Sequence, residues 1–144
     1  MLAGMAVSAA EPSGLFGMRK ESFATGMLLV QATSDAGANA LVRSVAADYE
    51  IAEGRKAASE ELKAKLAGGG PVQIKGRALD TLRQVAALVA AKAPADAPAF
   101  KAWLAHIAAS VAAASADGGF LGFGGGQVSE AEEVTLAEIS VALA

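Results

Sequence analysis

Apolar residues recur along this chain with the spacing of amphipathic helices. The first stripe consists of Phe16, Phe23, Met27 and Val30. Their intervals of seven, four and three residues place them on one face of a helix from about Leu15 to Ala32, which we expect to point inward. The turn-forming residues 34–37 predict the end of that helix.

Five more helices follow from the same pattern. A short one ends near Ala52, another spans Glu53 to Leu66, and a longer one spans Val72 to Lys92. The next begins after Asp96 as its N-cap, and the last begins after Ser129. The residues expected to face inward on these helices are Leu41, Val42, Val45, Leu62, Leu66, Leu79, Leu82, Val85, Val89, Phe100, Trp103, Leu104, Ile107, Val111, Leu136, Ile139 and Leu143.

Several helix boundaries carry clear signals. Gly68-Gly69-Gly70 ends one helix, and Pro71 suits the first turn of the next. Ser129 and Glu132 have the spacing of a capping box, in which each side chain accepts a hydrogen bond from the backbone amide of the other. No stretch of the sequence alternates with period two. The chain is therefore predicted to be an all-α, single-domain bundle of five to seven helices.

Two segments fall outside the predicted helices. Residues 1–12 are expected to be an N-terminal extension of the domain. Within them Val7-Ser8-Ala9 resembles a signal-peptide cleavage site, but the first ten residues lack a basic region and a long apolar run. Residues 118–127 form a glycine-aromatic loop between the last two helices.

Composition supports the helical prediction and excludes other classes. About a quarter of the 144 residues are alanine, the strongest helix former, and 53% are hydrophobic, which excludes a disordered chain. The absence of cysteine excludes a disulfide-stapled fold. The mean hydropathy is +0.39, but the chain has no run of roughly 20 apolar residues. We therefore expect no transmembrane segment and a cytoplasmic location.

Charge is distributed unevenly along the chain. All lysines and arginines lie between Arg19 and Lys101, and residues 102–144 carry five acidic side chains. This polarity suits a cation or a basic partner at the acidic end, or packing of that end beside the basic helices of the same domain. Scattered basic residues without interleaved aromatics, together with the acidic pI, argue against nucleic-acid binding.

The glycine-aromatic loop offers a candidate docking site. It does not follow a strand, and the helix after it begins with glutamates, so it is not expected to hold phosphate. Its apolar residues Phe120, Leu121 and Phe123 have two interpretations. They fold back to cover the core, or they form an exposed tip that binds a protein partner, a second copy of the chain or a membrane surface.

Catalytic chemistry has few candidates here. His106 is the single histidine, and with no cysteine nucleophile we expect a non-enzymatic protein in which His106 is a partly buried structural residue. A carboxylate site for calcium or magnesium needs no histidine. Its candidate ligands are Asp117, Glu130, Glu132 and Glu133. The alternative is that these glutamates only cap the helix and complement its dipole.

The segment 107–143 resembles the helix–loop–helix unit of tellurite-resistance TerB-like proteins. The resemblance rests on Ala116-Asp117-Gly118 at the end of an apolar helix and on Ser129 and Glu132 at the start of the next. It implies an all-α fold, a role in membrane-linked stress responses, and metal binding through acidic residues, with Asp117 and Glu132 as ligands.

An internal pseudo-repeat is also typical of that family. Residues 44–48 echo residues 110–114, but Arg55 stands where the first repeat would carry a glutamate. The glycine-aromatic insertion also separates the second acidic pair. The leading hypothesis is therefore a stress-associated protein that binds a divalent cation. The alternative is a structural module that docks a partner or a second copy through residues 118–126.

Overall fold

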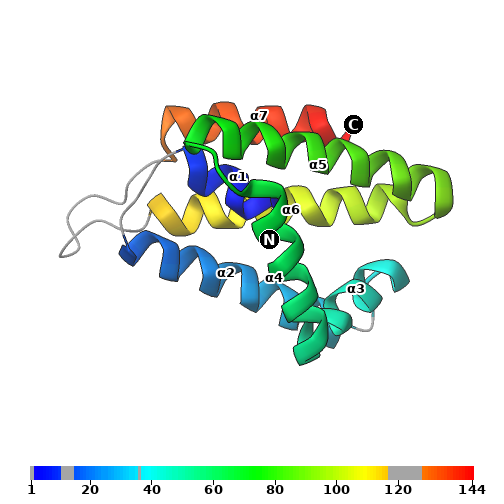
Figure 1. Cartoon of the computed structure of the whole chain (residues 1–144). Helices are drawn as coiled ribbons and strands as arrows, with labels where there is room; N and C mark the ends of the chain where they lie inside the picture. The colour runs from blue at the N-terminus through cyan, green and yellow to red at the C-terminus, as the bar shows by residue number, and fades with distance from the viewer. Residues whose placement is uncertain (1, 11–14, 36, 117–127) are drawn as a thin grey trace.

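The computed structural model describes residues 2–10, 15–35, 37–116 and 128–144, which contain seven α-helices and no strands (Figure 1). The helices are α1 (Leu2–Ala10), α2 (Leu15–Ser34), α3 (Ala40–Glu50), α4 (Ala52–Leu66), α5 (Pro71–Lys92), α6 (Ala97–Ala116) and α7 (Glu130–Leu143). The predicted all-α, single-domain bundle is confirmed. None of these helices combines the length and apolar character that a membrane crossing requires.

Helix α1 lies in the middle of the bundle, although the sequence suggested an extension for residues 1–12. It packs against α5, α6 and α7, and Ala3, Ala6 and Val7 are at most 1% exposed. Its small side chains allow this close approach, since a Cβ added to Gly4 would lie 3.1 Å from a methyl group of Val111 on α6. Helix α1 therefore belongs to the core through Ala3, Ala6 and Val7.

The larger buried cluster joins α1 to α5, α6 and α7. Its largest fully buried side chains include Leu82, Ile107, Val111 and Ile139, each 1% exposed. Since burying one such side chain contributes about 1.5–3 kcal/mol, this cluster is the main apolar source of stability. An ion pair between Lys75 on α5 and Glu138 on α7, 2.8 Å long, lies beside it.

A second cluster joins α2 and α3 to the first half of α6. It contains Leu29, Ala32, Val42, Ala46 and Phe100. Trp103 and Leu104 pack against both clusters, and the Trp103 ring lies 5.7 Å from that of Phe100. Helix α6 therefore contributes buried residues to both parts of the core.

Among the described side chains, three of those expected to face inward do not, while the predictions for Phe16 and Phe23 lie outside the described side chains. Met27 and Val30 are more than half exposed, and Val45 is 40% exposed, so these predictions are wrong. Residues 27–30 are all apolar, and contact of α2 with α6 and α3 selects the face that carries Leu29. On α3, packing likewise buries the face that carries the small residue Ala46 rather than the face that carries Val45.

Side chains at two helix starts connect α3 with α6. The Asn39 side-chain oxygen accepts from the backbone amides of Leu41 and Val42 and so caps α3. Its amide nitrogen donates to the Asp96 carboxylate over 2.8 Å. Asp96 stands at the start of α6, where its backbone oxygen accepts from Phe100 N. One hydrogen-bonded pair thus fixes the relative position of the two helix starts.

Candidate functional site

The acidic start of α7 is built on a capping box, as the sequence predicted. Glu132 N donates to Ser129 Oγ over 3.3 Å, and Glu132 Oε2 accepts from Ser129 N and Ser129 Oγ, each over 3.0 Å. These bonds satisfy amides that would otherwise lack partners at the helix start. Glu132 is only 4% exposed, so this carboxylate holds the helix end in place.

The other candidate metal ligands are not brought together with Glu132 in the described part of the chain. Glu130 and Glu133 are exposed. No group of three or more acidic or histidine side chains suited to a metal ion occurs among the described residues. Asp117 lies outside those residues, so the predicted pairing of Asp117 with Glu132 stays a prediction.

The candidate docking residues Phe120, Leu121 and Phe123 also lie outside the described residues, as does the rest of the loop at 118–127. The two interpretations of this loop, covering of the core and docking of a partner, therefore stay open as predictions.

His106 is exposed on α6, so the prediction of a partly buried histidine is wrong. The buried side of α6 at this level is formed by Ile107 and Ala108. Because consecutive helical residues differ by about 100° in direction, His106 falls beside this face rather than on it.

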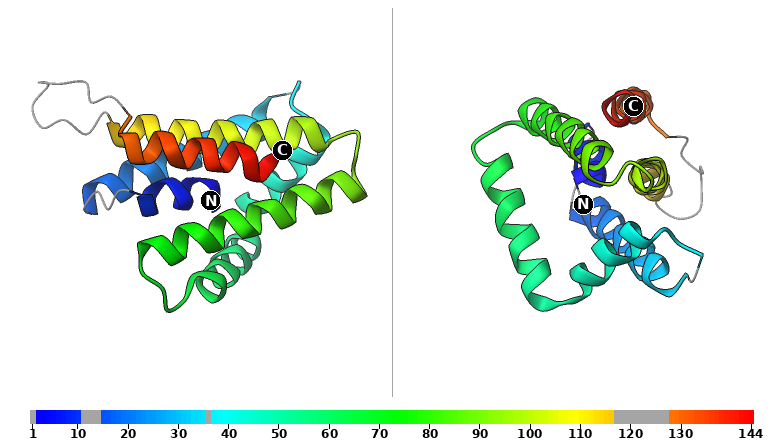
Figure 2. Two further views of the ribbon diagram at one scale, coloured as in Figure 1. Left: turned by 90° about the horizontal axis from the view of Figure 1, so that it is seen from above. Right: turned by 90° about the vertical axis from the view of Figure 1, so that its right-hand side faces the viewer.

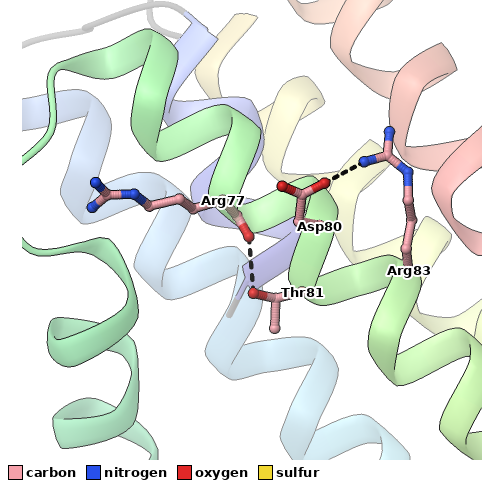
Figure 3. A network of polar contacts seen from close by, with 4 residues as sticks. All are labelled: Arg77, Asp80, Thr81 and Arg83. Carbon is pink, nitrogen blue, oxygen red and sulfur yellow. Dashed lines mark hydrogen bonds and ion pairs between the residues drawn. The ribbon is translucent and has the colours of Figure 1, made fainter.

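Polar side chains on α5 hydrogen-bond within their own helix (Figure 3). Thr81 Oγ1 donates to the backbone oxygen of Arg77 over 2.8 Å, and Arg83 pairs with Asp80 over 2.6 Å. Arg77 extends away from Asp80 in this view, and its guanidinium donates to the backbone oxygen of Ala67. The two contacts within α5, at spacings of four and three residues, are ordinary interactions on a helix surface, and Arg77 instead joins α5 to the preceding connection.

The outer face of α7 is a feature that the sequence analysis missed. Four exposed residues at intervals of four, three and four form one stripe along it: Glu130, Val134, Ala137 and Val141. Val134 is 51% and Val141 73% exposed. The helical spacing of these exposed residues is visible in the sequence. However, the inward stripe of Leu136, Ile139 and Leu143 was sufficient to predict the helix, so no role was predicted for a second apolar stripe.

Helix α7 lies along an edge of the bundle with α5 beside it (Figures 1 and 2). Its first turn is acidic, while at its other end Lys101 Nζ donates to the backbone oxygen of Ala144 over 2.9 Å. The edge therefore has an acidic first turn at one end, a lysine bonded to Ala144 at the other and exposed valines between them.

The fold and this edge define an all-helical bundle with an exposed apolar helix face. No protein-family model, curated protein or solved structure matches the chain.

Proposed function

We propose that this chain is a non-enzymatic interaction module that pairs with a second copy of itself through the outer face of α7. The observation that carries the proposal is the exposure of Val134 and Val141 on one stripe. Exposed apolar residues gathered on one face are typical of protein contact sites. Ala137 between the valines leaves room for a second helix to approach closely.

Charge supports an antiparallel arrangement of two α7 helices. In that arrangement Glu130 of one copy comes near the end of the other copy's α7, where Lys101 is held against Ala144. A parallel arrangement would instead bring two acidic first turns together. Opposite charges at the ends of an apolar contact fix its orientation, and like charges oppose it.

Sedimentation equilibrium of the full chain at increasing concentration tests this pairing. We expect a monomer–dimer equilibrium for the wild type. Val141→Glu is expected to raise its dissociation constant at least about tenfold, because a charge replaces an apolar contact. Val30→Glu, at a position of α2 that is also more than half exposed, serves as the control and should leave the equilibrium unchanged.

Exchanging the charges of two residues distinguishes antiparallel pairing from nonspecific association. Lys101→Glu is expected to weaken the dimer, and Glu130→Lys in the same chain is expected to restore it, since the two charges then trade places across the contact. A wild-type mass that stays monomeric at every concentration contradicts the proposal. So does equal weakening by Val30→Glu.

The second candidate function is stress-associated binding of a divalent cation, as the resemblance to TerB-like proteins implies. It is supported by the acidic character of the first turn of α7, and by the ability of oxygen ligands alone to hold calcium or magnesium. Its ligand set would combine Asp117 with Glu132 and Glu130.

Calorimetric titration with calcium chloride tests this second candidate. We expect binding with a dissociation constant of about 10⁻⁴–10⁻³ M, which Asp117→Ala abolishes. Glu53→Gln removes an acidic side chain from α4 and is the matched control, expected to bind as the wild type does. An absence of heat at millimolar calcium, or equal binding by Asp117→Ala, contradicts cation binding.

A further inference from the structure

Helix α4 is held to the bundle by very few apolar side chains. Its buried residues are Leu62 and Leu66, both in its second half. Neither belongs to the two buried clusters of the core. The charged residues of α4 are Glu53, Arg55, Lys56, Glu60, Glu61, Lys63 and Lys65. Most of the surface of this helix therefore faces water.

The ion pairs found on α4 among the described residues lie within the helix itself. Lys56 pairs with Glu60 at 4.0 Å and Lys65 with Glu61 at 3.3 Å, all on exposed side chains. Such pairs stabilise a helix but do not attach it to its neighbours. The packing contacts of α4 are chiefly with α3 and α5, the helices that precede and follow it in the chain.

Short connections join both ends of α4 to its neighbours in the chain. Ile51 alone separates α3 from α4, has an extended backbone, and contributes no side-chain cap to α4. At the other end, three glycines lead into α5, and Gly68 has a φ of 73°, a conformation that glycine adopts readily. Figure 2 shows α4 at the side of the bundle remote from α7.

Arginine side chains tie each of these connections to the backbone nearby. Arg55 donates to the backbone oxygens of Tyr49 and Glu50 across the α3–α4 corner. Arg77 donates from α5 to Ala67, just after α4. These bonds connect the ends of α4 to its chain neighbours, whereas Leu62 and Leu66 are its buried anchors in between.

We propose that α4 is a strap that unfolds locally as a separate unit, between Ile51 and residues 68–70, while the two core clusters stay folded. This opening breaks the contacts of Leu62 and Leu66 together with the hydrogen bonds inside α4, and so exposes its amides to water. Segments with few buried apolar contacts open at lower free energy than the core does. The strap is thus a conformational device that is independent of pairing through α7.

Hydrogen exchange of the full chain under native conditions, followed by mass spectrometry, tests the strap. Amides of residues 52–66 are expected to exchange at least about tenfold faster than those of α5 and α6. Their exchange should depend little on low urea concentrations, because a local opening exposes little surface. Exchange of α4 at the same rate and urea dependence as α6 would overturn the proposal.

A pair of neighbouring substitutions sharpens the test. Leu62→Ala is expected to speed exchange in α4 at least about tenfold while α6 changes less than about threefold, because truncation of a buried leucine removes a main anchor. Lys63→Ala alters an exposed position of the same turn and should leave exchange unchanged. If Leu62→Ala speeds exchange equally in α4 and α6, the strap is part of the global folding unit and the proposal is wrong.

Discussion

Replacing Ala6 with aspartate is expected to lower the free energy of unfolding by about 3–5 kcal/mol, or to prevent folding altogether. Ala6 is 0% exposed and lies on α1 among the apolar residues of the larger core cluster. A carboxylate there would have to lose its water without gaining a partner, and the packing around α1 leaves no room for it. Urea unfolding followed by circular dichroism measures the effect.

The adjacent residue Met5 provides the control, since it is 36% exposed. Met5→Asp carries the same new charge on the same helix and is expected to cost less than about 1 kcal/mol. Both variants are compared at one protein concentration, because self-association would also shift the unfolding midpoint. Equal unfolding midpoints for the two variants would contradict the position of α1 in the core.

The second large effect is expected from Leu82→Ala, which should cost about 2–5 kcal/mol of unfolding free energy. Leu82 is 1% exposed on the buried face of α5. Its truncation leaves a cavity among the helices that meet in the larger cluster, and the surrounding side chains relax only in part. Chemical denaturation of the purified variant checks the size of the loss.

Leu88 is the matched control for Leu82, because it lies on the same helix and is 57% exposed. Leu88→Ala is expected to change the unfolding free energy by less than about 1 kcal/mol, since little buried surface is lost and alanine favours the helix. A loss at Leu88 as large as that at Leu82 would show that the other face of α5 carries the packing.

The candidate site divides into a part that local sequence could specify and a part that it could not. The capping box of Ser129 and Glu132 was predicted and is confirmed, because its hydrogen bonds join residues three apart. It also explains why Glu132 alone is weak evidence for a metal ligand, since its carboxylate already serves the helix end. A contact of Glu132 with Asp117 would depend on the course of the chain between them, which local spacing does not specify.

The exposed face of α7 shows a different limit of sequence reasoning. Val134 and Val141 are spaced as regularly as the buried Ile139 and Leu143 are on the other side. The inward side of α7 was predicted and is confirmed, but apolar residues on a second side do not reveal whether that side is covered as well. The contacts of α7 with α1, α5 and α6 leave Val134 and Val141 exposed.

The sequence by itself determined the helical class and the limits of six helices, because spacing, glycine breaks and caps act between residues a few positions apart. Tertiary structure decided the rest. It put α1 in the core, since small residues such as Ala3 and Ala6 give little periodic signal yet permit close packing. It also determined that Leu29 rather than Val30 is buried on α2. More than one face of that helix is apolar, and the helices packed against it determine which face is buried.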